Sequence, residues 1–159
     1  MRKRNLVVTE LTLQQPILLV VEDDPTQQKV IRILAETFGY GAVIVSTGKE
    51  ALDALKVSDS CFDAILMDFK MPRMDGIETT RRIRESEAKT GRRTPIIAVT
   101  AYSSEFDQRA CLEAGMDDYL SKPFEPESLR KVLLRWTYNP GKPNLRLLPR
   151  SGPHMDAAP

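Results

Sequence analysis

Short apolar runs alternate with amphipathic segments along most of the chain. Segments with an apolar residue at every third or fourth position predict helices, and short, almost wholly apolar runs predict strands. The predicted strands are residues 16–21, 42–45, 62–67, 95–99 and 119–121, and the predicted helices are residues 25–38, 49–55, 77–88, 105–114 and 126–136. Five strand–helix units of this length indicate an α/β fold, in which helices cover both faces of a parallel sheet.

The ends of the first predicted helix are marked by single residues. An acid followed by a proline, here Asp24 and Pro25, is a strong start signal, with the acid as N-cap and the proline in the first helical position. Gly39 is a plausible stop for this helix. The apolar run that precedes the acid suits a parallel strand buried on both faces.

Polar side chains follow four of the predicted strands. Glu22 and Asp23 come after the first strand, Asp68 after the third, Thr100 after the fourth and Lys122 after the fifth. Because ligands of such folds bind beyond the carboxyl ends of the strands, we expect these side chains to meet at one edge of the sheet. Carboxylates crowded into one cleft repel one another unless a cation neutralises them, and oxygen ligands suit Mg²⁺. An ammonium and a hydroxyl beside them are donors for a phosphoryl oxygen.

Each of these residues also has a simpler explanation. An acid directly after a strand is most often a helix cap when it is considered singly, and we assign Asp24 to that role rather than to a metal. A lone threonine or a lysine–proline pair carries little information. The joint placement of acids, hydroxyl and lysine at the ends of four strands favours a common site.

The composition narrows the classes of function. A chain of 159 residues with 42% hydrophobic residues fits one globular domain plus tails. A net charge of +1 argues against broad electrostatic binding to nucleic acid, and no apolar run approaches the roughly 20 residues of a membrane-spanning helix. The two cysteines, Cys61 and Cys111, cannot form a disulfide framework, which favours a reducing cytoplasm. The single histidine, His154, stands near the C-terminus, so most serine-type and cysteine-type hydrolase mechanisms are excluded.

Four stretches of the sequence together resemble the receiver domain of two-component response regulators. They are Val20-Val21-Glu22-Asp23-Asp24, Met67-Asp68-Phe69-Lys70-Met71-Pro72-Arg73-Met74-Asp75-Gly76, Val99-Thr100-Ala101 and Tyr119-Leu120-Ser121-Lys122-Pro123-Phe124. The resemblance implies a flavodoxin-like (βα)5 three-layer sandwich with strand order 2-1-3-4-5. It covers about residues 16–136, which we expect to be the receiver domain, with 1–15 as a leader or linker and 137–159 as a flexible tail rich in proline and glycine.

The resemblance assigns a phosphoryl-accepting site. It implies that Asp68 is the phosphoacceptor and that Asp23 binds Mg²⁺ directly, together with Asp68 and the backbone carbonyl of Lys70. Glu22 acts on the ion through water in this scheme, and Mn²⁺ is a possible substitute for Mg²⁺. Lys122 bridges the phosphoryl group and the acceptor carboxylate.

The resemblance also implies a switch and its partners. Thr100 and Tyr119 match the switch pair of the family, which changes partner binding through the face formed by the fourth helix, fifth strand and fifth helix. The donor is an external phosphohistidine on a sensor histidine kinase or a histidine phosphotransfer protein, and a downstream protein receives the signal, with a homodimer as a further possibility. Such a protein is a cytoplasmic phosphoacceptor switch that assists its own phosphotransfer and dephosphorylation, rather than an enzyme with a separate substrate.

Two alternatives remain open at this stage. A Mg²⁺-dependent phosphohydrolase or phosphotransferase could use Asp68 on small phosphoesters, although Lys70 stands where haloacid-dehalogenase phosphatases have a second acid. A pseudo-receiver could bind partners without phosphate, although the acidic residues, Thr100 and Lys122 are all present. Whether the chain acts alone or belongs to a longer hybrid kinase or regulator also stays open.

Two residues depart from the commonest forms of the family. Lys70 places a long cation two residues after the acceptor, and Tyr102 places an aromatic ring two residues after Thr100. Both side chains can shade a phosphoryl group from attacking water, which leads to the hypothesis of a slowly decaying phosphoprotein. The simpler view is that both point into solvent.

Overall fold

The computed structural model describes residues 15–57, 62–101 and 104–138. Strands and helices alternate through these residues, as the hydrophobic pattern predicts. The elements are β1 (Ile17–Val21), α1 (Pro25–Thr37), β2 (Gly41–Val45), α2 (Gly48–Lys56), β3 (Ala64–Asp68), α3 (Gly76–Thr90), β4 (Ile96–Thr100), α4 (Glu105–Ala114), β5 (Asp118–Ser121) and α5 (Pro126–Thr137). Most of the predicted leader and tail lies outside the described residues, as do Cys61 and His154.

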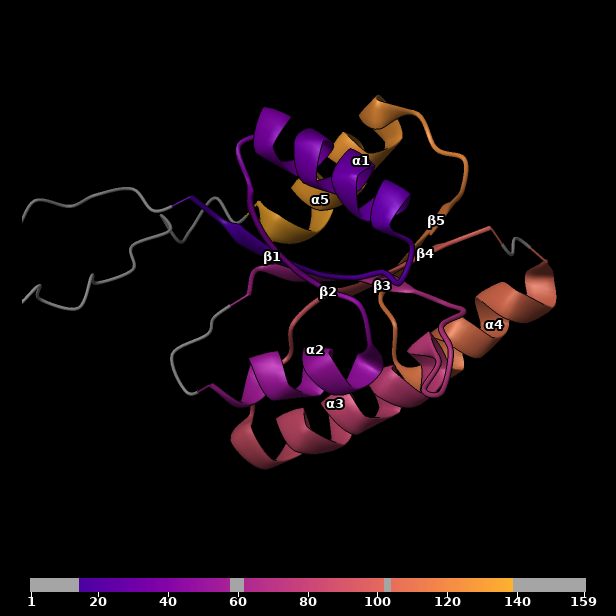
Figure 1. Cartoon of the computed structure of the whole chain (residues 1–159). Coiled ribbons are helices and arrows are strands. Elements are labelled where there is room, and N and C mark those ends of the chain that lie inside the picture. The colour runs from indigo at the N-terminus through magenta and orange to yellow at the C-terminus, as the bar shows by residue number, and fades with distance from the viewer. Residues whose placement is uncertain (1–14, 58–61, 102–103, 139–159) are drawn as a thin grey trace, which may run out of the picture. The chain divides into compact units, whose positions relative to one another are not determined.

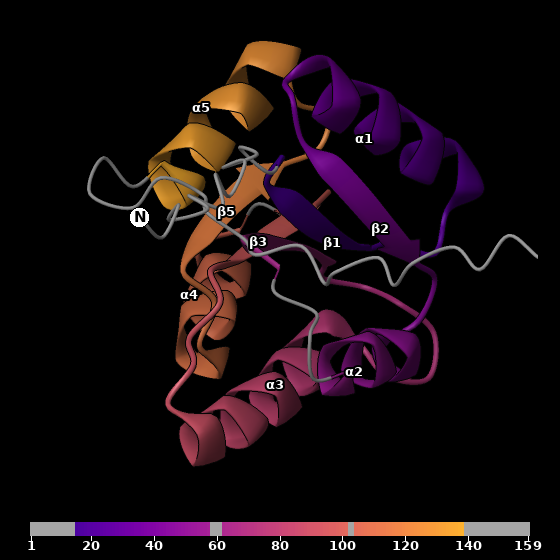
Figure 2. The ribbon, with the colours of Figure 1, turned by 90° about the vertical axis from the view of Figure 1, so that its left-hand side faces the viewer.

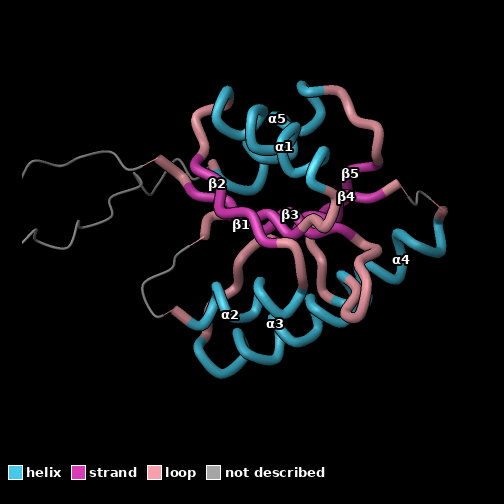
Figure 3. Tube along the Cα trace, viewed as in Figure 1, coloured by secondary structure: helices cyan, strands magenta, loops and turns pink. Residues whose placement is uncertain are grey.

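The strands form one parallel sheet between two layers of helices. Its order is β2-β1-β3-β4-β5, which confirms the order 2-1-3-4-5. Figure 1 shows α1 and α5 on one face of the sheet and α2, α3 and α4 on the other, and the turned view in Figure 2 shows the same layers. The tube in Figure 3 shows the strands in the middle layer. The predicted flavodoxin-like three-layer fold is therefore confirmed.

The core is divided into two parts because successive side chains of a strand point to opposite faces of the sheet. Leu18 and Val20 of β1 belong to the part beneath α1 and α5, while Leu19 and Val21 belong to the part beneath α2, α3 and α4. All four are at most 1% exposed. Burial on both faces explains why this strand reads as a continuous apolar run.

The predicted boundaries are close to the observed ones, and among the strands the third shows the largest difference. It was expected over 62–67 but extends from Ala64 to Asp68, so the candidate acceptor is the last residue of the strand. Asp63 stands outside the strand, where its carboxylate accepts the backbone N–H of Ile17 at 2.7 Å. This hydrogen bond holds Asp63 in the connection before β3, and so the strand starts later than predicted. The pattern of apolar residues does not reveal such a contact.

Helix capping follows the sequence signals. Asp24 is the N-cap of α1, and its side chain accepts the N–H groups of Thr26 and Gln27, as predicted. The helix places Pro25 in its first turn, where a missing N–H costs nothing. None of the described helices is long and apolar enough to cross a membrane.

Candidate functional site

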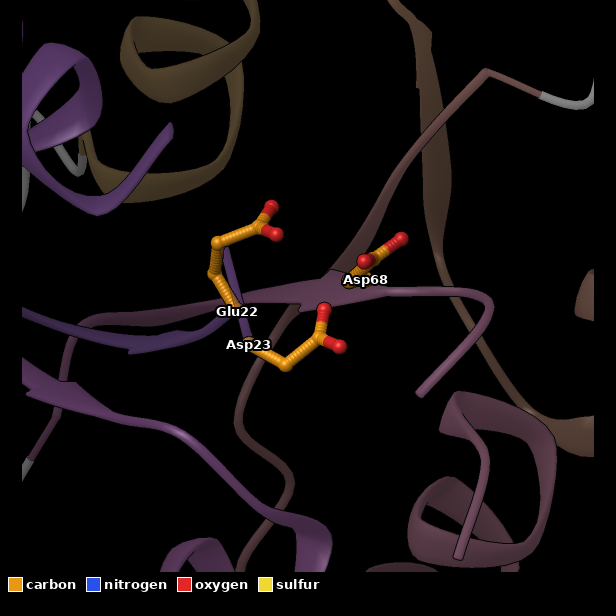
Figure 4. Close-up of side chains that lie close together, drawn as sticks. All are labelled: Glu22, Asp23 and Asp68. Carbon is orange, nitrogen blue, oxygen red and sulfur yellow. The ribbon is translucent and has the colours of Figure 1, made fainter. Parts of the chain in front are cut away.

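Three carboxylates converge at the carboxyl edge of the sheet. β1 pairs with β3 in parallel, with Val21 opposite Met67, so the residues that follow β1 lie beside the end of β3. Glu22, Asp23 and Asp68 each offer an oxygen atom within 4.8 Å of the others. Figure 4 shows Glu22 and Asp23 leaving the chain on opposite sides, with Asp68 across from both. The predicted convergence of these acids is therefore present in the fold.

Glu22 is held firmly in the interior. It is only 2% exposed, and its Oε1 accepts the backbone N–H of Asp24 at 3.2 Å. Its own N–H donates to the carbonyl of Val45 at 3.1 Å, and its carbonyl accepts Nε2 of Gln28 at 2.6 Å. Contacts from β2 and α1 thus fix the backbone of Glu22, and the N-cap residue Asp24 fixes its carboxylate.

Lys122 reaches this cluster from the segment after β5. Its Nζ lies 2.5 Å from Oε2 of Glu22 and 3.9 Å from Oδ2 of Asp68. Its backbone N–H donates to the carbonyl of Thr100 at 2.7 Å, so the end of β4 positions it. The lysine therefore forms ion pairs with both carboxylates, and the closer of the two is that of Glu22.

The side chains form a site suited to a hard divalent cation. All three carboxylate groups supply oxygen ligands, which Mg²⁺ prefers over nitrogen or sulfur. Lys122 compensates one of their charges when all are ionised, so two negative charges remain in excess. That excess and the donor set fit one divalent ion.

Asp68 has an unusual proton affinity. Burial raises its pKa from 3.8 to about 6 against the opposing effect of the Lys122 ammonium. The negative charges of Glu22 and Asp23 contribute to this rise in the pKa, while the backbone N–H of Lys70 opposes it. Burial and like charges disfavour the ionised form of a carboxyl, and a neighbouring cation stabilises that form.

This environment predicts a measurable titration. In the metal-free protein, the carboxyl carbon resonance of Asp68 should titrate with a midpoint near pH 6, above the ordinary 3.8. Added Mg²⁺ should lower the midpoint, because a bound cation favours the ionised form. A midpoint below pH 4 without metal would contradict the burial of this carboxyl.

The same shift predicts how stability depends on pH. A carboxyl whose pKa is raised in the folded state contributes stability that is fully present below its unfolded value, 3.8, and is lost as the pH rises through about 6. Without metal, Asp68→Asn should therefore melt at a higher temperature than the wild type at pH 8. The difference should shrink at pH 4.5, where the native carboxyl is protonated.

The predicted switch residues lie on β4, which pairs with β3, and on β5, which pairs with β4. Thr100 ends β4 and is 1% exposed, and Tyr119 is a partly buried residue of β5. The register places Tyr119 opposite Ala98, two residues before Thr100. The two residues are thus on paired strands, and Thr100 ends the strand that lies beside Asp68. Lys70 is exposed after β3, and Tyr102 lies outside the described residues.

The same arrangement is found in a known family. Residues 18–134 match the response regulator receiver domain. This chain belongs to that family. The match includes every residue of the candidate site, and it confirms the resemblance inferred from the sequence motifs.

Relatives place receiver domains like this one within much larger kinases. The chain is 38% identical over 137 residues to the sensor histidine kinase GacS of Pseudomonas protegens, covering 86% of this chain and 15% of that protein. It is 43% identical over 118 residues to the hybrid signal transduction histidine kinase I of Dictyostelium discoideum, covering 72% of this chain and 7% of that protein. The chain therefore spans only a small part of these relatives.

Solved receiver domains have the same fold. The receiver domain of the sensor histidine kinase PA1611 from Pseudomonas aeruginosa, which has a magnesium ion coordinated in its active-site cleft, is 42% identical, with a TM-score of 0.69 and coverage of 78% of this chain and 98% of that one. The receiver domain of Ssk1 from Saccharomyces cerevisiae, solved with the histidine phosphotransfer protein Ypd1, is 28% identical, with a TM-score of 0.71 and coverage of 79% and 91%.

Gly76, the glycine that ends the Asp68 motif of this receiver domain, has a structural role that the sequence motifs did not predict. Gly76 begins α3, and its N–H donates to the carbonyl of Phe69 at 3.0 Å. A Cβ on Gly76 would stand 2.2 Å from the carbonyl oxygen of Asp68. Asp75 before it caps α3 by accepting the N–H of Glu78 at 2.8 Å. The glycine thus lets α3 begin directly against the candidate acceptor, and the Asp-Gly pair at the motif's end was the available signal.

Proposed function

We propose that Asp68 accepts a phosphoryl group from a phosphohistidine on a sensor histidine kinase or a histidine phosphotransfer protein. The observation that carries this proposal is the position of its carboxylate, at the end of β3 beside two acids and 3.9 Å from the Lys122 ammonium. The family of the chain supports it, since receiver domains act in two-component phosphorelays. The Ypd1–Ssk1 complex, in which a phosphotransfer protein binds a receiver domain, supports the class of donor.

The metal belongs to the same proposal. Asp23, Asp68 and the backbone carbonyl of Lys70 would hold Mg²⁺, with Glu22 acting through water, and Mn²⁺ would substitute because it takes the same oxygen ligands. The acidic cluster supports this assignment, as does the magnesium ion in the PA1611 receiver domain. When bound, the ion supplies charge neutralisation around the transferring phosphoryl group.

The residues of this chain carry the transfer. An ionised oxygen of Asp68 attacks phosphorus in line with the phosphorus–nitrogen bond of the donor, and the electron pair of that bond leaves with the imidazole nitrogen. Lys122 donates to a phosphoryl oxygen and offsets the charge that gathers there. The product is an acyl phosphate on Asp68, and attack by water on phosphorus later releases inorganic phosphate. The domain in this way assists its own phosphorylation and dephosphorylation.

Thr100 and Tyr119 would transmit the change. The hydroxyl of Thr100 donates to a phosphoryl oxygen, and the ring of Tyr119 turns inward, which shifts the balance between two packings of the α4–β5–α5 face. Exposed apolar side chains on α4 support protein contacts there, since Phe106 is 80% and Leu112 62% exposed. We assign this face to a downstream protein target or a second copy of the chain rather than to nucleic acid.

We assign residues 16–136 to the receiver domain, which the compact unit over Gln15–Tyr138 supports. We place its phosphorelay in the cytoplasm, where kinases have access to ATP. The alternative of a phosphoester hydrolase has no observation in its favour. Lys70, which occupies the position of the second acid of that class, is an exposed cation.

Phosphate transfer tests the proposal directly. A phosphotransfer protein carrying ³²P on its histidine should pass the label to this chain in the presence of Mg²⁺. Chelation of the metal by EDTA should slow the transfer, and added p-nitrophenyl phosphate should not be turned over catalytically. Steady hydrolysis of the phosphoester without a labelled intermediate would favour the hydrolase class instead.

The lifetime of the acyl phosphate gives a separate prediction. Lys70→Ala combined with Tyr102→Ala should shorten the half-life of the phosphoprotein by a few-fold, because both changes remove cover from attacking water. The measurement is loss of ³²P after removal of the donor, and an unchanged half-life would contradict the shading role.

A further inference from the structure

The Glu22–Lys122 pair is placed as an alternative to a metal ion. Nζ of Lys122 is 2.5 Å from Oε2 of Glu22 and 3.9 Å from Oδ2 of Asp68. The side chains are well shielded from water, with 3% exposure for Glu22 and 15% for Lys122. Within the part of the chain that the structure describes, no other ammonium or guanidinium forms an ion pair with Glu22.

We propose that Glu22 couples metal binding to the position of Lys122: the Lys122 ammonium and the divalent cation compete for this one carboxylate. The inference rests on the proposed function only in taking the acidic cluster as the cation site. It gives Glu22 a positioning role, in addition to any contact with the ion through water.

The burial of Glu22 makes the competition strong. Its Oε1 already accepts the N–H of Asp24, so Oε2 depends on Lys122 for a partner. An ionised carboxylate that loses its partner in a buried site is strongly destabilised. Lys122 therefore leaves Glu22 readily only when another cation replaces it, and the bound metal is that replacement.

The side-chain length of Glu22 contributes to this competition between Lys122 and the metal ion. A glutamate reaches one methylene further than an aspartate, and its Oε2 lies 2.5 Å from the Lys122 ammonium. Asp23, the neighbouring acid, is exposed and has no ion pair with Lys122 among the described residues. Of the three acids, Glu22 is thus the one in close contact with Lys122, while Asp68 lies at the longer distance of 3.9 Å.

Replacement of Lys122 by the metal ion at Glu22 would precede the phosphoryl transfer. Once Lys122 leaves Glu22, the nearest carboxylate to its ammonium is that of Asp68, where the phosphoryl group is proposed to bind. Metal binding would then release the lysine toward the phosphoryl site. In the metal-free protein, Lys122 stays engaged with Glu22 and contributes less to the reaction.

A double-mutant cycle on metal affinity tests this coupling. The four proteins are the wild type, Lys122→Met, Glu22→Gln and the double variant, and the dissociation constant for Mg²⁺ is measured from amide shifts in NMR titrations. Lys122→Met should tighten Mg²⁺ binding about tenfold when Glu22 is present and less than about threefold when it is replaced, because coupled pairs deviate from additivity by this order. Loss of the lysine charge alone would act similarly in both backgrounds.

Lys70→Met is the matched control. It removes another cation near Asp68, but the Lys70 side chain is exposed, whereas Nζ of Lys122 lies 2.5 Å from the buried Glu22 carboxylate. The effect of Lys70→Met should therefore be the same in both backgrounds. Lys122→Gln repeats the cycle with a polar side chain, and dispersed amide spectra confirm that each variant is folded.

Two outcomes would overturn the inference. Either Lys122→Met and Lys122→Gln both change the Mg²⁺ affinity by equal factors with and without Glu22, or the wild type does not bind Mg²⁺ at all. Neither measurement uses phosphate, so phosphoryl transfer to Asp68 can succeed while the coupling fails. A coupled cycle without transfer would support the coupling and contradict the proposed function.

Discussion

Asp68→Asn is expected to lower the rate of phosphoryl transfer from a labelled phosphotransfer protein to this chain by more than about 100-fold. Removal of a nucleophile has effects of this order or larger. The neutral amide keeps the shape of the side chain but lacks the ionised oxygen that attacks phosphorus. It also removes one of the three carboxylates of the cation site. The variant should fold, because the change relieves the unfavourable burial that raises the pKa of the carboxyl to about 6.

The matched control for this variant is Asp53→Asn. Asp53 is an exposed acid of α2 whose partners are Lys49 and Lys56, and exposed pairs of this kind contribute little to stability. The control should accept the phosphoryl group as the wild type does. Full labelling of the Asp68→Asn variant would show that another residue is the acceptor.

Gly76→Ala is expected to destabilise the domain by about 3 kcal/mol, at the upper end of typical overpacking costs. The added Cβ would stand 2.2 Å from the carbonyl oxygen of Asp68, and backbone atoms cannot rotate away as a flexible side chain can. Either α3 or the end of β3 must move, which displaces Asp68 from Glu22 and Asp23. Urea denaturation measures the loss of stability, and a weaker affinity for Mg²⁺ should accompany it.

Gly41→Ala provides the comparison for this glycine. A Cβ there would meet Cγ1 of Ile17 at 3.5 Å, an ordinary contact, and β2 requires no positive φ at this residue. Its stability should stay within about 0.5 kcal/mol of the wild type, as for most surface changes. Equal stability of both alanine variants would contradict the close approach of α3 to Asp68.

The order of the elements could be predicted from the sequence because periodicity and capping are local properties. Strands buried on both faces require continuous apolar runs, such as the one before Glu22, and a helix start requires a cap such as Asp24. The meeting of Glu22, Asp23 and Asp68 could also be expected, since parallel strands of one sheet share a carboxyl edge. The exact strand order came from the resemblance of four motifs rather than from periodicity.

Contacts between side chains far apart along the chain were beyond the sequence. The contact between the Lys122 ammonium and the carboxylate of Glu22, 100 positions away in sequence, was not among the expectations drawn from the motifs. Which carboxylate the lysine reaches depends on the anchoring of β1 and β5 and on the length of two side chains. The contact of Gly76 with the carbonyl of Asp68 likewise depends on the angle at which α3 leaves the sheet.

The amino-acid sequence by itself therefore determined the alternation of strands and helices and the kinds of group present at the carboxyl edge, because these follow from the residues themselves and their near neighbours. Only the tertiary structure decided how strongly Asp68 holds its proton and which acid Lys122 binds. Both depend on burial and on distances of a few ångströms, and these exist only after the strands and helices have packed together.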